Sequence, residues 1–450
     1  MSIIKPRTMP GVMELLPLEQ AAFQAFMDTI RKGFECHGYL PIETPVMEFT
    51  DVLLSKTGGD TEKQVYFAQS TGSRQQGQEP ELALRFDLTV PLARYVGEHE
   101  GQLVFPFRRY QMQRSYRGEA PQRGRYREFY QCDIDIIGRE NLDLGFDAEI
   151  PAVIHAVFQA LNIGAFTIQF NNRKLLLGLL EGLGIEGIER QALVLREIDK
   201  GDKVGPKGVR AALLRLSLDN DTTDAIMNFV AIDGVPSTVL AALEKWPNPH
   251  PLFVEGLGEL RQVTNWVKGF GVPETDFAIN LSIARGLDYY TGTIYETRLD
   301  AHPELGSICS GGRYDDLASH YTKSRLPGVG ASIGATRLFY KLRELGLVGE
   351  GNASIQVLVT QLDPELRSHY LQFATQLRRA GIATDLWMQK GRFKKQMKYA
   401  NRLSIPLVLI MGEDELSAGV VTLKLMDTGE QRRVSIDDLV GSATAMLAER

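Results

Sequence analysis

Residues 284–296 read Ala284-Arg285-Gly286-Leu287-Asp288-Tyr289-Tyr290-Thr291-Gly292-Thr293-Ile294-Tyr295-Glu296. The stretch places a permanent cation, a glycine, a carboxylate and adjacent tyrosines directly before a strand-like run. Arginine stays charged in a dry pocket and can hold a phosphate or carboxylate through two parallel hydrogen bonds. Tyrosine rings offer flat apolar faces with a polar tip, which suits a small aromatic ligand. Any three of these residues are common where a loop enters a strand, so the whole string, and not its parts, indicates a binding site.

The whole string resembles the histidine-specific signature of histidyl-tRNA synthetases. A second stretch, Ser310-Gly311-Gly312-Arg313-Tyr314-Asp315, resembles the glycine-rich turn that accompanies this signature in the family. The resemblance runs from about Gly11 to the end of the chain. It implies an α+β fold, in which the antiparallel catalytic sheet of class II synthetases has flanking helices, a helical insertion and a C-terminal α/β anticodon-binding domain.

Length and composition are those of an ordinary globular protein. The 450 residues are enough for two or three domains, and the net charge of -6 gives no support to a globally basic nucleic-acid binder. Cys36, Cys132 and Cys309 show neither metal-ligand spacing nor a disulfide framework, which favours a reducing cytoplasm. The N-terminus lacks the apolar core of a signal peptide, and the apolar run at 405–411 is too short to cross a bilayer.

The patterns predict four segments and a linker. Strand patterns are absent from about residue 171 to 270, and a glycine-punctuated linker spans 346–352. Beyond the linker, strand and helix patterns alternate, which predicts a separate α/β domain. In the insertion, helices are predicted over residues 173–183, 188–200, 207–218, 221–232 and 255–270. The predicted domains are catalytic (1–170), helical insertion (171–275), catalytic again (276–345) and anticodon-binding (353–450).

The first half of the chain begins with a helix and an edge strand. Pro17 starts a helix with apolar residues at a period of about 3.6, and Gly38 ends it. The extended segment 40–48 carries prolines that suit an edge strand rather than a central one. This combination resembles the first motif of class II synthetases, which lies at a dimer interface, so the resemblance implies a homodimer.

The segment that follows residue 84 has two interpretations. Asp87, at the end of a strand and two residues before Thr89, suits an N-cap of the next helix. The same segment, 84–95, resembles the part of the family that receives the ammonium group of the amino acid. The resemblance assigns Asp87, Leu88 and Thr89 to histidine binding.

The pattern of residues 107–135 predicts a strand, then a loop rich in arginine, and then a second strand. In that strand Gln131, Asp133 and Asp135 fall on one face, which is unusual in a large sheet unless the face lines a polar cavity. The alternative is a solvated sheet face with a basic hairpin.

This segment resembles the second class II motif. The resemblance implies that Arg117 holds the ATP α-phosphate, Glu119 contacts the adenine amino group and Arg125 lies near the phosphates. It also places Gln131 and Asp135 in the amino-acid pocket.

The third motif is expected at 327–338, where small residues at a strand-to-helix corner allow close approach of a ligand. The resemblance makes Arg337 the residue that holds the γ-phosphate. The family usually has glutamate before this arginine, whereas this chain has Thr336, which puts a supporting hydrogen bond in question.

A basic stripe is predicted on one helix of the last domain. Lys394, Lys398 and Arg402 fall on one face, opposite a face with Phe393, Met397 and Ala400 that is expected to be buried. A charged stripe is usually a solvated face. The absence of acids between residues 390 and 402 favours contact with a phosphate backbone. The domain resembles the anticodon-binding domain of this group of synthetases, so the three basic residues are tRNA-binding candidates.

The implied reaction has two steps. Histidine and ATP give histidyl-adenylate and pyrophosphate, and histidine then passes to the 3′ end of tRNA(His). The resemblance implies that Arg285 and Arg117 are catalytic, and that Tyr289 and Tyr290 join Arg285 in the histidine site. ATP is a substrate that brings Mg²⁺, and no tightly bound cofactor, resident metal, DNA or membrane is expected.

Two other classes of protein are alternatives to this enzyme. One is a non-enzymatic regulatory relative that senses histidine for ATP phosphoribosyltransferase; such proteins usually lack the last domain and the ATP motifs. The other is a module that senses uncharged tRNA, which would need a fused effector domain.

Overall fold

A computed structural model describes residues 3–54, 64–120, 124–286, 290–315, 318–349 and 355–449. The chain forms two compact units. The first consists of Met1–Glu14 and Phe26–Val348, and the second of Leu15–Ala25 and Gly349–Arg450.

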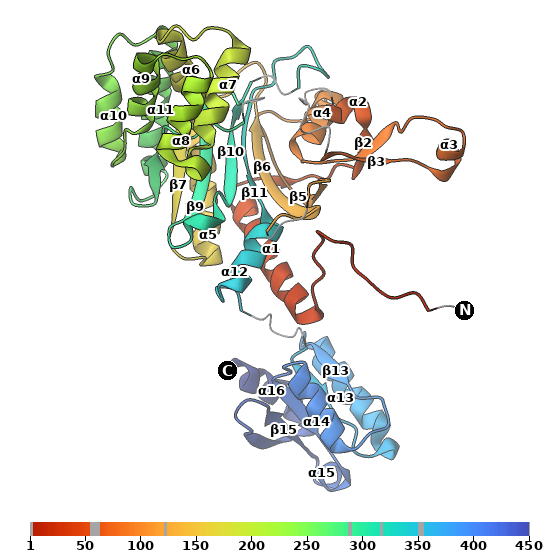
Figure 1. Ribbon diagram of the computed structural model, residues 1–450. Helices are drawn as coiled ribbons and strands as arrows, with labels where there is room; N and C mark the ends of the chain where they lie inside the picture. Colours follow the sequence, from red (N-terminus) through yellow and green to blue (C-terminus); the bar gives the residue numbers. More distant parts are fainter. Residues whose placement is uncertain are drawn as a thin grey trace. The chain divides into compact units, whose positions relative to one another are not determined.

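An eight-stranded sheet forms the centre of the first unit, in the order β1-β5-β6-β11-β10-β9-β7-β8 (Figure 1). All neighbouring strands are antiparallel except β1 with β5 and β7 with β8, which are parallel. The predicted α+β class is therefore confirmed. The strands are β1 (Leu40–Pro41), β5 (Phe107–Tyr116), β6 (Glu128–Ile137), β7 (Phe166–Asn172), β8 (Phe277–Ile279), β9 (Thr293–Leu299), β10 (Cys309–Tyr314) and β11 (Gly328–Ile333).

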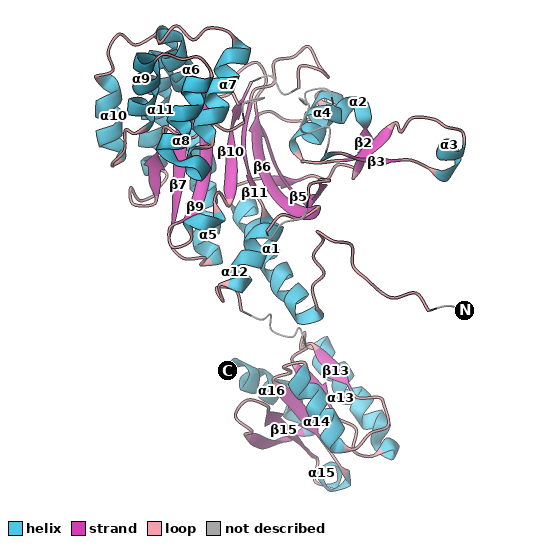
Figure 2. Cartoon of the chain, in the orientation of Figure 1, coloured by secondary structure: helices cyan, strands magenta, loops and turns pink. Residues whose placement is uncertain are grey.

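Helix α12 (Ala335–Glu344) packs on β6 and α5 (Gly145–Leu161) packs on β11, while α1 (Pro17–Cys36) contacts β6 and α12 (Figure 2). Cys132 on β6 contacts Met27 of α1, with 3.8 Å between the sulfur atoms. Phe26 of α1 meets Phe339 of α12, with 5.6 Å between ring centroids. Because strand side chains alternate, Gln131 lies on the opposite side of β6 from the Cys132 contact with α1.

Helix α1 confirms the prediction from its periodicity. Phe26, Ile30 and Phe34 are all buried. Burying each such side chain stabilises the fold by roughly 1.5–3 kcal/mol. Gly38, with φ of +79°, follows the helix in the left-handed conformation that ends helices.

The segment 40–48 was predicted as one edge strand, and the structure divides it in two. Leu40–Pro41 forms the edge of the large sheet, whereas β2 (Met47–Phe49) is an edge of a three-stranded sheet with the order β2-β4-β3. Pro41 ends β1 and Pro45 lies between the two short strands; neither has an N–H to donate to a ladder, so one strand does not continue from β1 into β2. The small sheet includes β3 (Tyr66–Ala68) and β4 (Leu82–Leu84) and is joined by α2 (Thr50–Leu54), α3 (Thr71–Gln75) and α4 (Thr89–His99).

A helical segment connects β7 to β8. The predicted helices are present, but a further helix, α10, begins at Pro236. This proline was interpreted as a separator. It occupies the start of a helix, where its missing N–H costs no hydrogen bond. The helices are α6 (Arg173–Gly182), α7 (Ile188–Asp199), α8 (Gly201–Arg215), α9 (Asn220–Val230), α10 (Pro236–Glu244) and α11 (Pro251–Gly269).

The second unit contains a five-stranded sheet with the order β13-β12-β14-β15-β16. Its strand and helix alternation was predicted, apart from the short helix α15 and the last strand, β16. The elements are β12 (Val357–Val359), α13 (Arg367–Arg379), β13 (Thr384–Leu386), α14 (Phe393–Arg402), β14 (Leu407–Ile410), α15 (Glu413–Ser417), β15 (Val420–Leu425), β16 (Gln431–Ser435) and α16 (Leu439–Ala448).

The buried face of α14 differs from the prediction. Phe393 is 38% exposed, whereas Gln396 is 1% exposed. The Gln396 side chain accepts a hydrogen bond from the Gln361 backbone N–H at 2.9 Å and donates one to the Gln361 carbonyl at 2.7 Å. An amide whose polar groups are satisfied can be buried at low cost, so the polar residue takes the inner position.

No helix in the described part of the chain is long and apolar enough to cross a membrane.

Candidate active site

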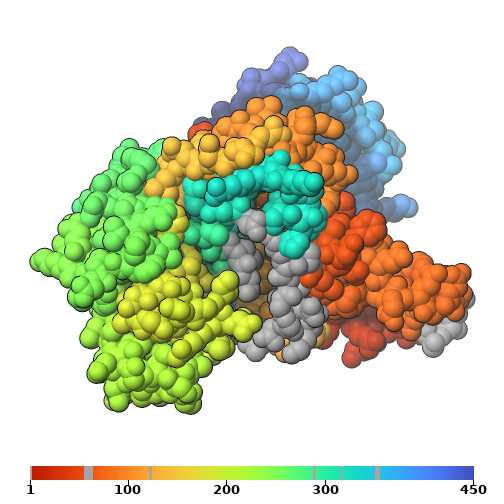
Figure 3. Space-filling view, turned by 90° about the horizontal axis from the view of Figure 1, so that it is seen from above, coloured from red at the N-terminus to blue at the C-terminus, as the bar shows by residue number. Residues whose placement is uncertain are grey.

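A cavity of about 350 Å³ lies in the first unit, lined by parts of β6, β10, β11 and α12. Figure 3 shows one face of the molecule from above, with the helical segment in yellow-green and green on one side and the segment of α2, α3 and α4 in orange on the other. Most of the site residues predicted from the sequence line this cavity: Asp87, Thr89, Arg117, Glu119, Arg125, Gln131, Arg285, Tyr290 and Arg337.

A second, smaller cavity of about 30 Å³ is lined by Asp133 and Asp135, and it shares Thr89 and Tyr290 with the first. Leu88 was predicted at this site, but its side chain is fully buried and does not appear among the described lining residues of either cavity. An apolar side chain next to a strand end packs into the core while its polar neighbours face the cavity. Tyr289 lies outside the described residues.

The floor of the site is a set of polar cross-strand pairs between β5 and β6. Opposite Gln131, Asp133 and Asp135 on β6 lie three polar residues of β5: Gln113, Gln111 and Arg109, respectively. Directly opposed side chains on one sheet face interact. The polar face predicted from the alternation in β6 is therefore continued by the neighbouring strand.

Asp135 has two buried partners. Its carboxylate lies 2.5 Å from an Nη2 atom of Arg109 and accepts a hydrogen bond of 2.7 Å from the Tyr314 hydroxyl. Burial raises the pKa of Asp135 to about 6, against the opposing effects of Arg109 and Tyr314. Burial likewise raises the pKa of Asp133 to about 7, with Arg109 opposing the shift.

Two buried acceptors on β6 have no hydrogen-bond partner among the described residues: Gln131 Oε1 and Asp133 Oδ1. The Gln131 amide is fixed in orientation, because its Nε2 donates to Ser332 Oγ at 3.0 Å. A buried acceptor without a partner is costly unless a ligand supplies the donor. The arrangement therefore suits a ligand that carries N–H groups.

The sequence interpretation did not assign Arg109 or Tyr314 to the site, and it placed Asp133 on the polar face of β6 without giving it a role in binding. The signal for Arg109 was present, because Arg109, Gln111 and Gln113 alternate in β5 just as the polar residues do in β6. Pairing of the two strands would have brought the two polar faces together. The role of Tyr314 depends on the fold of β10 beside β11, for which the sequence carries no local signal.

Leu88 occupies the N-cap position of α4, and the side chain of Asp87, one residue before it, bonds to the first turn of the helix and also lines the cavity. Its Oδ1 accepts a hydrogen bond of 3.1 Å from the Val90 backbone N–H in the first turn of α4. The capping hydrogen bond is thus present although the N-cap residue is Leu88, and it does not exclude a ligand, because Asp87 also lines the cavity. Burial raises the pKa of this carboxyl, with Val90 and Arg117 opposing.

The other end of the large cavity is rich in arginine. Arg117 donates from Nε to the Phe86 carbonyl at 3.0 Å and lies 5.2 Å from the Phe129 ring centroid. Arg125 forms an ion pair of 3.1 Å with Glu119. These contacts hold the two arginine side chains at the cavity. An anion bound there would pair with their charges, so no unpaired charge would be buried.

Arg337 lies on α12 and donates to the Leu305 carbonyl. Burial lowers the pKa of Arg337, and the nearby positive charges of Arg125 and Arg285 act in the same direction. These three arginines repel one another, so a bound polyanion would stabilise all three charges. The preceding residue, Thr336, accepts a hydrogen bond of 2.8 Å from the Tyr130 backbone N–H, so a supporting contact exists where the family usually has glutamate.

Gly286 is required by the geometry beside Arg285. Its φ is +65°, and a Cβ atom there would lie 1.9 Å from the Tyr290 ring. Only glycine fits both conditions. The signature stretch therefore keeps Arg285 and Tyr290 close together at the cavity.

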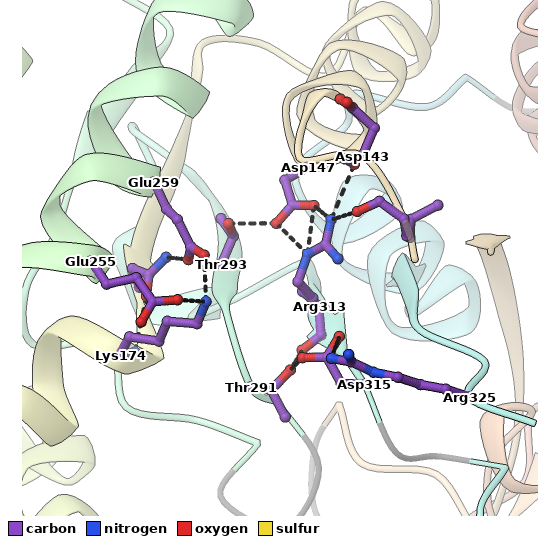
Figure 4. Close-up of polar contacts among 12 residues, drawn as sticks. Asp143, Asp147, Lys174, Glu255, Glu259, Thr291, Thr293, Arg313, Asp315 and Arg325 are labelled. Atoms are coloured by element: carbon purple, nitrogen blue, oxygen red, sulfur yellow. Dashed lines mark hydrogen bonds and ion pairs between the residues drawn. The ribbon is translucent and has the colours of Figure 1, made fainter. Parts of the chain in front are cut away.

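A buried ion pair between Arg313 and Asp147 fixes the second stretch singled out in the sequence, residues 310–315 (Figure 4). Arg313 donates to the Asp147 carboxylate from Nε at 2.9 Å and from Nη2 at 2.6 Å, and Thr293 donates to the same carboxylate at 2.7 Å. Thr291 donates from its backbone N–H to the Arg313 carbonyl at 2.8 Å and from its hydroxyl to Asp315 at 2.6 Å. The two stretches singled out in the sequence are thus bonded to each other.

Comparison with known proteins decides the family. The family model for histidyl-tRNA synthetase matches residues 11–338, and a model for the anticodon binding domain matches residues 356–445. The chain belongs to the histidyl-tRNA synthetase family. This agrees with the resemblance of the two signature stretches.

Relatives of similar length support the same family. The chain is 53% identical to the histidine–tRNA ligase of Stenotrophomonas maltophilia and 54% identical to that of Xanthomonas oryzae pv. oryzae. The comparisons cover 99% of this chain in both cases, and 99% and 98% of the two relatives. The crystal structure of histidyl-tRNA synthetase from Nostoc sp. PCC 7120 has a TM-score of 0.89 at 39% identity, covering 98% of this chain and 100% of that one.

Membership in the histidyl-tRNA synthetase family confirms the prediction of an aminoacyl-tRNA ligase. A structure described as an ATP phosphoribosyltransferase regulatory subunit/histidyl-tRNA synthetase from Bacillus halodurans C has a TM-score of 0.73, but at 21% identity this shows the fold alone. The regulatory alternative is therefore not favoured over the ligase.

Proposed function

We propose that the cavity of the first unit activates L-histidine with ATP and then transfers histidine to the 3′ end of tRNA(His). One observation carries this proposal. The small cavity has two carboxylates and no arginine among its described lining residues, whereas the adjoining large cavity has four arginines. An amino acid with an ammonium group and further N–H donors and a polyanionic nucleotide can thus meet at one site.

At the carboxylate end, we propose that histidine binds through both of its nitrogen-bearing groups. Asp87 and the free acceptor of Gln131 would receive the α-ammonium group. Asp135 and Tyr290 would face the imidazole ring, and Asp133 would offer the ring a further hydrogen-bond acceptor. The role predicted for Tyr289 stays a prediction.

At the arginine end, we propose that Arg117 and Arg285 flank the α-phosphorus and that Arg337 holds the γ-phosphate. Glu119 would contact the adenine amino group, and Arg125 would lie near the phosphates. Mg²⁺ would enter with the ATP substrate. The attacking group is the carboxylate of histidine, so the first step needs no general base. Catalysis then consists of positioning and neutralising charge on the phosphates.

Histidine-dependent exchange of labelled pyrophosphate into ATP tests this assignment directly. The full chain should exchange pyrophosphate with histidine and not with other amino acids. Binding of histidine without any exchange would instead favour the regulatory alternative.

For the domains, we propose that residues 171–275 are an insertion that contacts the acceptor arm of tRNA between two catalytic segments, 1–170 and 276–345. Residues 353–450 would bind the anticodon region. ATP and tRNA are cytoplasmic substrates, and we propose the cytoplasm as the site of action.

Binding of tRNA by the second unit is proposed from the exposed basic face of α14. Lys394, Lys398 and Arg402 are all exposed. Replacing the three with glutamine should raise the KM for tRNA roughly tenfold and reduce the slope of log KM against log salt by about one for each phosphate that a cation no longer neutralises. Pyrophosphate exchange should not change, because the substitutions lie outside the cavity.

A matched control uses the neighbouring helix α13, in which Arg367, Arg378 and Arg379 are also exposed. Replacing these three with glutamine removes the same charge from the same unit. An equal rise in the KM for tRNA in both variants would show that net charge, and not the α14 face, decides binding.

We also propose a homodimer formed through the two short edge strands. Leu40, Met47 and Phe49 are 65%, 51% and 56% exposed, and apolar side chains beside unpaired strand edges favour association. Light scattering should give a mass of about twice the 50.2 kDa of one chain. Replacing Met47 and Phe49 with lysine should shift the mass toward that of one chain; a stable, active monomer of the unaltered chain would contradict the proposal.

A further inference from the structure

The arginine proposed for catalysis is held by a carboxylate outside the substrate-binding set. Arg285 forms an ion pair through Nε with Glu296 on β9. Glu296 is 1% exposed, whereas the Arg285 side chain is 42% exposed and also lines the large cavity. A flexible, half-exposed cation thus has one firmly placed partner, which restricts where its guanidinium can lie.

Glu296 is shared between two arginines. Glu296 and Arg298 are two positions apart on β9, so their side chains lie on the same face of the strand. Arg298 donates from Nη2 to Glu296 Oε2 at 3.2 Å. The buried carboxylate of Glu296 therefore partly neutralises the positive charges of both Arg285 and Arg298.

Both arginines also meet carboxylates of the helical segment. Asp199, the last residue of α7, lies 3.8 Å from Arg285 Nε. Asp202, in the first turn of α8, forms an ion pair with Arg298. The charges alternate along a chain that starts and ends at the corner between α7 and α8: Asp199, Arg285, Glu296, Arg298 and Asp202.

We propose that Glu296 is a positioning residue for Arg285, and that the α7–α8 corner completes the arrangement through Asp199 and Asp202, so that the helical segment affects activation of histidine. The proposal rests on the catalytic role proposed above for Arg285. Removing Asp202 frees Arg298 to pair only with Glu296, which weakens the hold of Glu296 on Arg285. Removing Asp199 takes away the second carboxylate near Arg285.

The first test measures pyrophosphate exchange by Glu296→Gln, which keeps the shape of the side chain and removes its charge. The kcat should fall about 10- to 100-fold, because small misplacements of a catalytic group have effects of this size. The KM values for histidine and ATP should change little. In an Arg285→Ala background the same substitution should change kcat less than about twofold, since no catalytic guanidinium is left to position.

The second test uses the α7–α8 corner, where the side chains of Asp199 and Asp202 are 35% and 53% exposed. The double variant Asp199→Asn/Asp202→Asn should lower kcat about two- to fivefold, the range expected for solvent-exposed pairs. The matched control is Asp224→Asn in the same helical segment, whose carboxylate is 53% exposed like that of Asp202 and pairs with Arg210 at 2.8 Å. The control should exchange pyrophosphate at the parental rate.

The outcomes separate this inference from the proposed function. If Arg285→Ala keeps the parental rate, the catalytic role of Arg285 is wrong, and the inference falls with it. If Arg285→Ala is impaired but Glu296→Gln and the corner variant are not, only the inference is overturned. An equal loss from Glu296→Gln with and without Arg285 would show a purely structural effect and would also overturn it.

Discussion

Replacing Arg285 with alanine should lower the kcat of histidine-dependent pyrophosphate exchange by about 10²- to 10³-fold. The substitution removes a cation from the place where negative charge develops on the α-phosphorus. Arg117 and Arg337 remain, so ATP should still bind, and the KM for histidine should rise less than kcat falls. Steady-state exchange at varied histidine and ATP separates these effects.

Arg139→Ala is a suitable control for this prediction. Arg139 belongs to the same unit, is 48% exposed and pairs with Glu100 at 2.8 Å, but it does not line the described part of the cavity. Its loss removes an arginine of similar exposure without touching the site. Near-parental exchange by the Arg285 variant would refute the catalytic assignment.

Replacing Asp135 with asparagine should raise the KM for histidine by roughly 10- to 100-fold and the KM for ATP far less. The variant keeps the shape of the side chain but leaves the buried charge of Arg109 without its partner, next to the position proposed for the imidazole. An uncompensated cation there disfavours a ligand with N–H donors. Kinetics at varied histidine and ATP measure the two effects separately.

Loss of a buried charge also affects folding, so the control must share that property. Asp147 is likewise buried and paired with an arginine, Arg313, but it does not line either cavity within the described residues. Asp147→Asn should lower the thermal stability without a selective rise in the KM for histidine. If Asp135→Asn raised both KM values equally, the histidine pocket would be misplaced.

The sequence predicted those parts of the fold that a local period determines. The apolar period of α1 and the polar alternation of β6 both appear in the structure, and most predicted site residues meet at one cavity. The signature stretches were informative because they combine unusual residue types within a few positions.

What could not be predicted depends on contacts between distant residues. Spacing alone placed Phe393 inside and gave no role to Gln396, whose burial depends on the Gln361 backbone 35 residues away. Spacing also could not show that Leu88 turns away from the cavity while Asp87 faces it. Asp135 was found from its own strand, but its partners Arg109 and Tyr314 come from two other strands.

The helical segment between β7 and β8 has a further consequence for how this protein can vary. The two strands that it joins are parallel neighbours, with Ile168 opposite Phe277, so the segment is a crossover that leaves the sheet at one end of the strands and re-enters it at the other end, beside the strand that it left. Its length can therefore change without altering the order of the other strands. The segment can be exchanged as a cassette only if the replacement keeps its contacts with the rest of the unit, which α11 makes with α5 and β7 and which the α7–α8 corner makes through Asp199 and Asp202.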